Sequence, residues 1–103
     1  MNIDIKVNEK NHWQVTGELS FDSVPKLSKT GCGIITKYEH VIFDLQDVIA
    51  VDNSGLALLT TWTRFANKLD KSICFVNLPD KLLDIAKLSG LENILPISET
   101  NDG

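Results

Sequence analysis

The chain has 103 residues and a mass of 11.4 kDa, with 43% hydrophobic and 23% charged residues. This length provides one hydrophobic core, and the composition excludes a disordered or fibrous chain. The formal net charge of −4 and the isoelectric point of about 5.0 argue against binding to nucleic acid or to anionic lipid, so the expected partner is a protein or a small molecule.

The N-terminal third of the chain predicts a hairpin and a helix. Apolar and polar residues alternate over 3–7 and again over 13–17, the period-two pattern of two half-buried strands joined by a polar turn. The glycine at position 17 is expected to end the second strand. A first helix is expected to start near Asp22 or Ser23, both good N-cap residues, and to end at the glycine-containing segment 30–33.

The middle of the chain predicts a buried strand followed by the longest helix. The apolar run Val41–Leu45 is typical of a central strand that is covered on both faces. A further apolar stretch, 48–51, has no element assigned to it. It precedes Asp52 and Asn53, either of which can cap the helix that continues from Gly55.

The C-terminal third predicts a strand, a helix and a short edge strand. The strand covers 73–76, and the helix covers 79–88 with a proline at its first position. Gly90 is expected to cap the end of this helix. The segment 94–97 is expected to lie at a sheet edge, because proline is tolerated there.

The predicted elements define the fold class. Their order, β-β-α-β-α-β-α-β, contains β-α-β crossovers that make the middle strands parallel. We therefore expect an α/β fold with a mixed β-sheet and helices packed on it. One domain should span residues 1–98, followed by a frayed tail over 99–103.

The longest helix has a core-facing stripe and an unusual opposite face. The opposite face begins with Leu56 and Ala57 beside Thr60 and Thr61, a small apolar and hydroxyl patch typical of a protein-docking surface. The alternative is that these residues have no function, since single exposed leucines are common. The stripe expected to face the sheet consists of Leu58, Leu59, Trp62, Phe65, Ala66 and Leu69.

The polar residues offer little chemistry. Asp44, Asp47 and Asp52 lie close in sequence, but a strand end, a turn and a helix cap account for them without a metal ion or an acid–base pair. His12 and His40 precede strands without further ligands at suitable spacing, and we expect both at the surface. No phosphate-binding glycine motif is present. We expect no catalytic residue, metal ion or cofactor.

The cysteines and the apolar runs favour a cytoplasmic location. Cys32 and Cys74 lie far apart among apolar neighbours, so we expect reduced, buried thiols rather than a disulfide or a reactive site. The first residues lack the features of a secretory signal peptide. No apolar run approaches the ~18 residues that span a bilayer, so any membrane contact is expected to pass through a partner and not through direct insertion.

Two segments, Phe43–Val48 and Val51–Leu56, resemble the STAS family, the domain shared by sulfate transporters and anti-sigma factor antagonists. The shared pattern is a strand ending in Asp-Leu, a turn, and Asp-x-x-Gly-Leu at the start of the central helix. Leu88–Leu91 is similar to the family's late Leu-Ser-Gly-Leu, and the resemblance runs from residues 16–19 to Pro96. Within the family, the chain is most similar to MlaB-like members in the segments Gly55–Leu59, Leu83–Leu88 and Ile94–Pro96.

The resemblance implies a non-catalytic domain that works by binding a partner. MlaB-like proteins bind the ATPase subunit of the Mla phospholipid ABC transporter, which also contains a permease and maintains outer-membrane lipid asymmetry. Such a subunit would lie in the cytoplasm, peripheral to the inner membrane through its partner. Antagonist-type relatives bind a kinase that is also an anti-sigma factor. In both cases the start of the central helix forms the contact, which implies partner-binding roles for Asp52, Asn53, Ser54, Leu56, Ala57, Thr60, Thr61 and Arg64.

Position 53 departs from the family pattern. The residue after the motif aspartate is the phosphorylated serine in antagonist-type relatives and usually threonine in MlaB-like members, whereas here it is Asn53. An amide cannot be phosphorylated, so a phosphate-dependent switch cannot act at this position. Ser54 remains as an alternative hydroxyl. The departure favours the transporter subunit, with a phosphorylated anti-sigma factor antagonist as the alternative and a ligand pocket within the domain as a third hypothesis.

Overall fold

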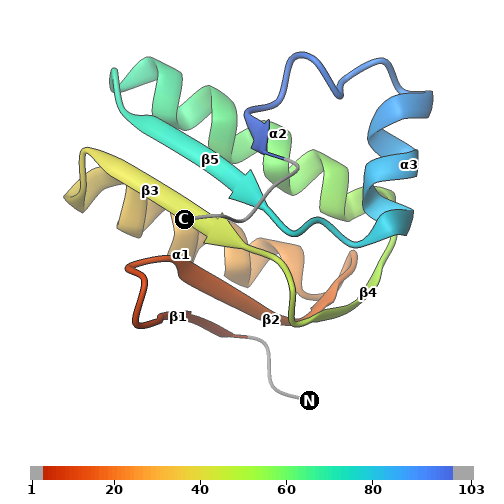
Figure 1. Ribbon diagram of the computed structural model, residues 1–103, viewed down its shortest axis with the longest axis horizontal. Helices are drawn as coiled ribbons and strands as arrows, with labels where there is room; N and C mark the ends of the chain where they lie inside the picture. Colours follow the sequence, from red (N-terminus) through yellow and green to blue (C-terminus); the bar gives the residue numbers. More distant parts are fainter. Residues whose placement is uncertain (1–3, 99–103) are drawn as a thin grey trace.

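The computed structural model describes residues 4–98, which form strands and helices in the order β-β-α-β-β-α-β-α-β (Figure 1). This order matches the predicted one except for an additional strand before the central helix. The elements are β1 (Asp4–Val7), β2 (Trp13–Leu19), α1 (Val24–Lys37), β3 (His40–Asp44), β4 (Val48–Val51), α2 (Asn53–Lys68), β5 (Ser72–Val76), α3 (Asp80–Leu88) and β6 (Ile97–Ser98).

The strands form a mixed sheet in the order β1-β2-β3-β5-β6, and β4 pairs with β2 outside this path. β1 is antiparallel to β2, and the other pairs are parallel. The connections advance across the sheet in one direction, so right-handed crossovers place the helices on the same face. Figure 1 shows α1 and α2 behind the sheet. The predicted α/β class is confirmed, but helices cover β3 on one face and not on both.

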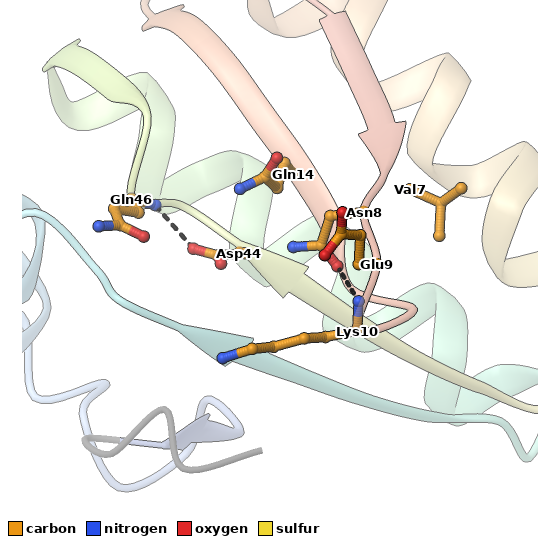
Figure 2. Close-up of a pocket in the computed structure, with 7 residues that line it drawn as sticks. All are labelled: Val7, Asn8, Glu9, Lys10, Gln14, Asp44 and Gln46. Carbon is orange, nitrogen blue, oxygen red and sulfur yellow. Dashed lines mark hydrogen bonds between the residues drawn. The ribbon is translucent and has the colours of Figure 1, made fainter.

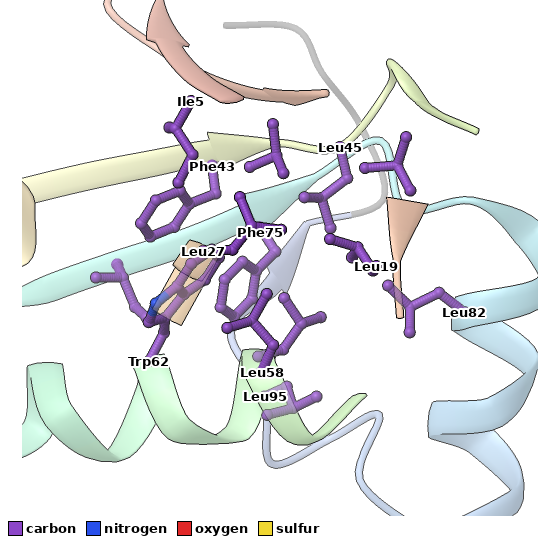
Figure 3. Packing of buried hydrophobic residues seen from close by; sticks show 14 of the residues in the cluster. Ile5, Leu19, Leu27, Phe43, Leu45, Leu58, Trp62, Phe75, Leu82 and Leu95 are labelled. Carbon is purple, nitrogen blue, oxygen red and sulfur yellow. The ribbon is translucent and has the colours of Figure 1, made fainter. Parts of the chain in front are cut away.

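The centre of the core is an aromatic stack between α2 and the sheet (Figure 3). The ring of Trp62 lies 4.3 Å from that of Phe43, at an angle of 13° between their planes, and Phe75 continues the stack. All three side chains are fully buried. The indole Nε1 donates to the carbonyl of Ser28 at 3.3 Å, which satisfies the one polar group of this side chain. The stack therefore joins α1, α2, β3 and β5.

The prediction that the first helix ends at residues 30–33 is wrong, because α1 continues to Lys37. Gly31 lies inside the helix, where a Cβ atom would overlap the indole ring of Trp62. The absence of a side chain at position 31 therefore permits close packing between α1 and α2, and this glycine does not terminate the helix. Gly33, two residues later, faces open space.

β2 does not end at Gly17 as predicted. Gly17 adopts a φ of 99°, and the pairing register shifts between Gly17 and Glu18. The strand then continues to Leu19 beside β4, with Leu19 opposite Val51. The predicted order lacks β4 because its pairing partner is distant in sequence, and four apolar residues do not by themselves distinguish a strand from a loop.

The remaining predicted elements agree with the structure apart from their limits. The hairpin, the central strand and the strand over 73–76 are confirmed. Gly90, with a φ of 73°, caps α3 as predicted, since its N–H and that of the next residue donate to carbonyls in the last turn of the helix. The edge strand lies at Ile97–Ser98 and not at 94–97. Residue 3 and the predicted tail at 99–103 lie outside the described residues.

The contact between α1 and α2 predicts opposite effects for two glycine substitutions in one helix. Gly31→Ala should lower the free energy of unfolding by about 1–3 kcal/mol, because the new methyl group overlaps Trp62. Gly33→Ala, the matched control, should raise it by about 0.5–1 kcal/mol through helix propensity. Urea denaturation measures both values. A neutral Gly31→Ala variant would contradict this account of the packing.

Candidate partner-binding surface

The start of α2 is held by Asp52, which occupies the N-cap position and is one of the two residues predicted as possible caps. Its Oδ1 accepts a hydrogen bond from the N–H of Ser54 at 2.7 Å, and its Oδ2 accepts from the N–H of Phe21 at 3.4 Å. The backbone N–H of Asp52 in turn donates to the carbonyl of Leu19 at 3.1 Å. Asp52 therefore caps the helix and joins it to the segment between β2 and α1. Its negative charge also interacts favourably with the partial positive charge at the N-terminus of the helix.

Gly55 lets the first turn of α2 approach its neighbours closely. A Cβ atom at this position would lie 3.2 Å from Cβ of Leu19 and 3.6 Å from Cδ1 of Leu82 in α3. The helix start is thus packed between the end of β2 and α3. This packing holds the backbone at the beginning of α2 in place against its neighbours.

The structure corrects the prediction that Leu56 is exposed. Its side chain is 8% exposed and belongs to the core cluster. Thr63, which is not part of the predicted core-facing stripe, is also buried at 9% exposure, and its hydroxyl donates to the carbonyl of Leu59. The buried arc of α2 is wider than the predicted stripe because α1, α3 and the sheet all contact the helix. Conversely, Leu69 was predicted in the stripe but lies just beyond the helix end and is exposed.

The other predicted partner-binding residues share the outer side of α2. Asn53, Ala57, Thr61 and Arg64 are exposed, as is Asp52 at the cap. Their spacing of three to four residues places the four helical positions in one stripe along the helix. Ser54 and Thr60 are half-buried, and the hydroxyl of Thr60 donates to the carbonyl of Leu56. We call this outer stripe the α2 face: Asn53, Ala57, Thr60, Thr61 and Arg64.

Two large exposed apolar side chains, in the segments that adjoin the start of α2, were not identified from the sequence. Phe21, in the segment between β2 and α1, is 80% exposed, and Ile49 in β4 is 74% exposed. For Phe21 the sequence did hold a signal of exposure, because a large aromatic residue stands in a predicted connection between two elements. For Ile49 the sequence holds no such signal, because its neighbours Val48 and Val51 are equally apolar and yet buried.

A second region, between the β1–β2 turn, the start of β2 and the carboxyl end of β3, contains an open cavity of about 690 Å³ on the helix-free face of the sheet (Figure 2). Asp44 lines it and is almost fully buried. Its Oδ1 already accepts from the N–H of Gln46 at 2.9 Å and from Nδ2 of Asn77 at 3.1 Å. The carboxylate therefore fixes the turn after β3, as predicted from its place at a strand end.

The histidines behave differently from one another. His40 is exposed as predicted, whereas His12 is 4% exposed, so its predicted surface position is wrong. His12 belongs to the tight turn before β2, which is closed by the N–H groups of Lys10 and His12 donating to Oδ1 of Asn8. Among residues 4–98, no three histidine, cysteine, aspartate or glutamate side chains lie close enough together to hold a metal ion.

Both cysteines are free thiols, half-buried where full burial was predicted. Desolvation raises the pKa of Cys32 and of Cys74 above the ordinary value of a thiol, and hydrogen bonds only partly oppose this effect. A raised pKa lowers the fraction of reactive thiolate at neutral pH. The geometry therefore gives neither thiol the activation that a nucleophile requires.

A family model described as "Mlab, STAS domain" matches residues 6–96. The chain belongs to the STAS family. The anti-sigma-B factor antagonist of Bacillus subtilis (strain 168) is 26% identical over 104 residues, covering 100% of this chain and 95% of that protein. A solved anti-sigma factor antagonist from Mycobacterium paratuberculosis matches with a TM-score of 0.79 at 18% identity, covering 98% of this chain and 87% of that one. An anti-sigma-factor antagonist (STAS) domain protein from Planctomyces limnophilus matches with a TM-score of 0.72 at 13% identity, covering 96% and 91%.

These matches confirm the family and the fold predicted from the two segments around Asp44 and Asp52. The structural likenesses extend over almost the whole chain, so the STAS domain accounts for the described elements. The longest helix among the described residues, α2, has 16 residues. Within residues 4–98, no helix is both long and apolar enough to cross a membrane.

The cap of α2 predicts a graded effect of substitutions at Asp52. Asp52→Ala removes both hydrogen bonds and should lower the free energy of unfolding by about 1–2 kcal/mol. Asp52→Asn keeps one side-chain oxygen as an acceptor and should lose less than half as much. Urea denaturation of the two variants tests this order. Equal losses would show that the charge, and not the cap, provides the stabilisation.

Proposed function

We propose that this STAS domain is a non-catalytic accessory subunit of an ABC-type phospholipid transport system of the Mla type. It binds the cytoplasmic ATPase subunit through the α2 face and supports the assembled, active form of that subunit, which itself acts on a permease. The protein thereby lies in the cytoplasm at the inner membrane through its partner. The family model that covers residues 6–96 supports this proposal, because its description names Mlab.

The observation that carries the proposal is the exposed stripe at the start of α2, whose backbone is held by a cap and close packing. Asn53, Ala57 and Thr61 present an amide, a methyl group and a hydroxyl on a helix whose start is fixed by Asp52 and Gly55. Small side chains on a rigid backbone lose little conformational entropy on binding. This surface therefore suits a long-lived subunit contact that needs no chemical modification.

The polar groups of the domain support a role without catalysis. The carboxylates of Asp44 and Asp52 are held by backbone and amide hydrogen bonds that serve a turn and a helix cap. The thiols of Cys32 and Cys74 have raised pKa values. These groups serve the structure of the domain, so we assign its function to a surface that binds another protein.

The alternative is an anti-sigma factor antagonist, which the match to the Bacillus subtilis protein over the whole chain favours. This function would use a kinase that is also an anti-sigma factor as its partner, and it would require a phosphorylated hydroxyl at the start of α2. Asn53 offers none, and Ser54 is half-buried beside the cap.

Substitutions on the α2 face test the transporter proposal. Ala57→Arg and Thr61→Arg each add a bulky cation to the stripe, so affinity for the purified ATPase subunit should fall at least tenfold while stability stays nearly unchanged. The matched control is Asn67→Arg, an exposed position on the same helix about 15 Å from Ala57. Leu56 is unsuitable because it is buried.

Isothermal titration calorimetry of the variants with the ATPase subunit gives the affinities, and urea denaturation verifies the folded state. Wild-type affinity in both Ala57→Arg and Thr61→Arg would place the contact elsewhere. If the unmodified domain does not bind the ATPase subunit at all, the transporter proposal is wrong.

Intact-mass measurement separates the two candidate functions. After incubation with ATP and an anti-sigma factor kinase from the same organism, we expect no added phosphate, because position 53 is an amide and Ser54 is half-buried. A Ser54→Ala variant is the control. One phosphate on the unmodified domain that is absent from this variant would support the antagonist function.

A further inference from the structure

We infer that the docking surface extends beyond α2 onto the β2–α1 connection and β4. There, Phe21 and Ile49 are the anchors that insert into an apolar pocket with a basic rim on the partner protein. This inference rests on the proposed function and adds the chemistry of the partner surface. A stable protein contact buries about 800 Å² on each side. Since the α2 face is one stripe about 16 Å long from Asn53 to Arg64, a contact of that size must include neighbouring elements.

The two regions are physically continuous. The N–H of Phe21 donates to the carboxylate of Asp52, the residue that starts α2. On the other side, β4 leads directly into Asp52, and its residue Val51 lies opposite Leu19 in β2. Phe21 and Ile49 therefore belong to the two segments that meet at the start of the α2 face.

The two anchors are the kind of residues that dominate protein contacts. Phe21 and Ile49 are 80% and 74% exposed, so each leaves most of a large apolar side chain in water until a partner covers it. Hot-spot residues are large side chains that enter pockets near the centre of a contact and are surrounded by polar residues. The position of Phe21 beside the helix start meets this description.

The charges around the anchors specify the partner. Segments 17–25 and 46–59 contain carboxylates and no lysine, arginine or histidine, and the next cations along the chain are Lys26 in α1 and Arg64 in α2. An anionic lipid surface, a nucleic acid or an acidic protein would be repelled, whereas a protein pocket edged by arginine and lysine would be attracted. The surface thus fits a partner protein with an apolar pocket and a basic rim. The carboxylates are Glu18, Asp22, Asp47 and Asp52, of which the last three are exposed.

The end of α3 provides matched controls. Leu88 and Ile94 are as exposed as the two anchors, at 89% and 68%. Charges of both signs flank them, including Lys87 and Glu92. They therefore match Phe21 and Ile49 in exposure and size but lack the acidic surroundings and the connection to the cap of α2.

The first experiment measures binding to the purified ATPase subunit. Phe21→Ser and Ile49→Thr should each weaken the affinity at least tenfold, whereas Leu88→Ser and Ile94→Thr should change it less than threefold. All four positions are exposed, so the variants should fold, which circular dichroism verifies. Wild-type affinity in both anchor variants, or equal losses in anchor and control variants, would overturn the inference while leaving the proposed function in place.

The salt dependence tests the basic rim. Raising the salt concentration from roughly 50 mM to roughly 300 mM should slow association at least threefold. The double variant Asp22→Asn/Asp47→Asn should lose most of this dependence. Asp84→Asn/Glu92→Gln, with the same change in charge at exposed sites on and after α3, should keep it. A salt-independent association of the unmodified domain would overturn the assignment of a basic partner surface.

A crosslinking experiment in cells separates failure of this inference from failure of the proposed function. With p-benzoylphenylalanine in place of Phe21, we expect a crosslink to the ATPase subunit, and none with the same group in place of Leu88. A crosslink from position 21 to a different protein would refute the proposal that the ATPase subunit is the partner. If that crosslink is lost in Asp22→Asn/Asp47→Asn, the result would still support the extended docking surface. No crosslink at position 21 would overturn the surface, whatever the ATPase subunit binds.

Discussion

The packing of Trp62 between α1 and the sheet is the constraint on which the rest of the structure depends. Its indole stacks on Phe43 and lies against a position of α1 that only glycine can occupy without displacement. The hydrogen bond from its Nε1 to Ser28 fixes the ring orientation. Because a buried tryptophan holds a helix at one rotation about its axis, this contact determines which side of α2 faces the solvent. The residues of the α2 face are exposed because Trp62, on the other side of the helix, is held in the core.

The start of α2 combines stability and recognition in the same few residues. Asp52 caps the helix, and its second carboxylate oxygen accepts from the backbone of Phe21. Gly55 allows the helix to approach Leu19 and Leu82. A surface built on such contacts is preorganised, so less free energy is lost to ordering when a partner binds. Variants at Asp52 therefore affect folding and binding together, whereas variants at Ala57 and Thr61, which take no part in the cap, test binding alone.

The charge of the domain gains a more specific meaning in the structure. As a total of −4 it argues only against nucleic acid and anionic lipid. The fold brings segments 17–25 and 46–59 together through the pairing of β2 with β4, and both carry only acidic charges. Local charge therefore favours a basic partner surface at the same place where large apolar side chains are exposed. The net charge of the chain does not contain this information, because the two segments are distant in sequence.

Local patterns determined the hairpin, the parallel middle strands, the cap at Asp52 and the STAS family, because these depend on alternation, spacing and short motifs. Contacts between distant segments decided the rest. α1 passes through Gly31 because Trp62 packs there, and Leu56 is buried because α1, α3 and the sheet all contact α2. β4 forms because the end of β2 offers it a pairing partner, and the same pairing joins the strand that leads to Phe21 with the strand that contains Ile49. Burial is a property of surroundings, so only the tertiary structure separates an apolar residue that holds the core from one that is exposed for a partner.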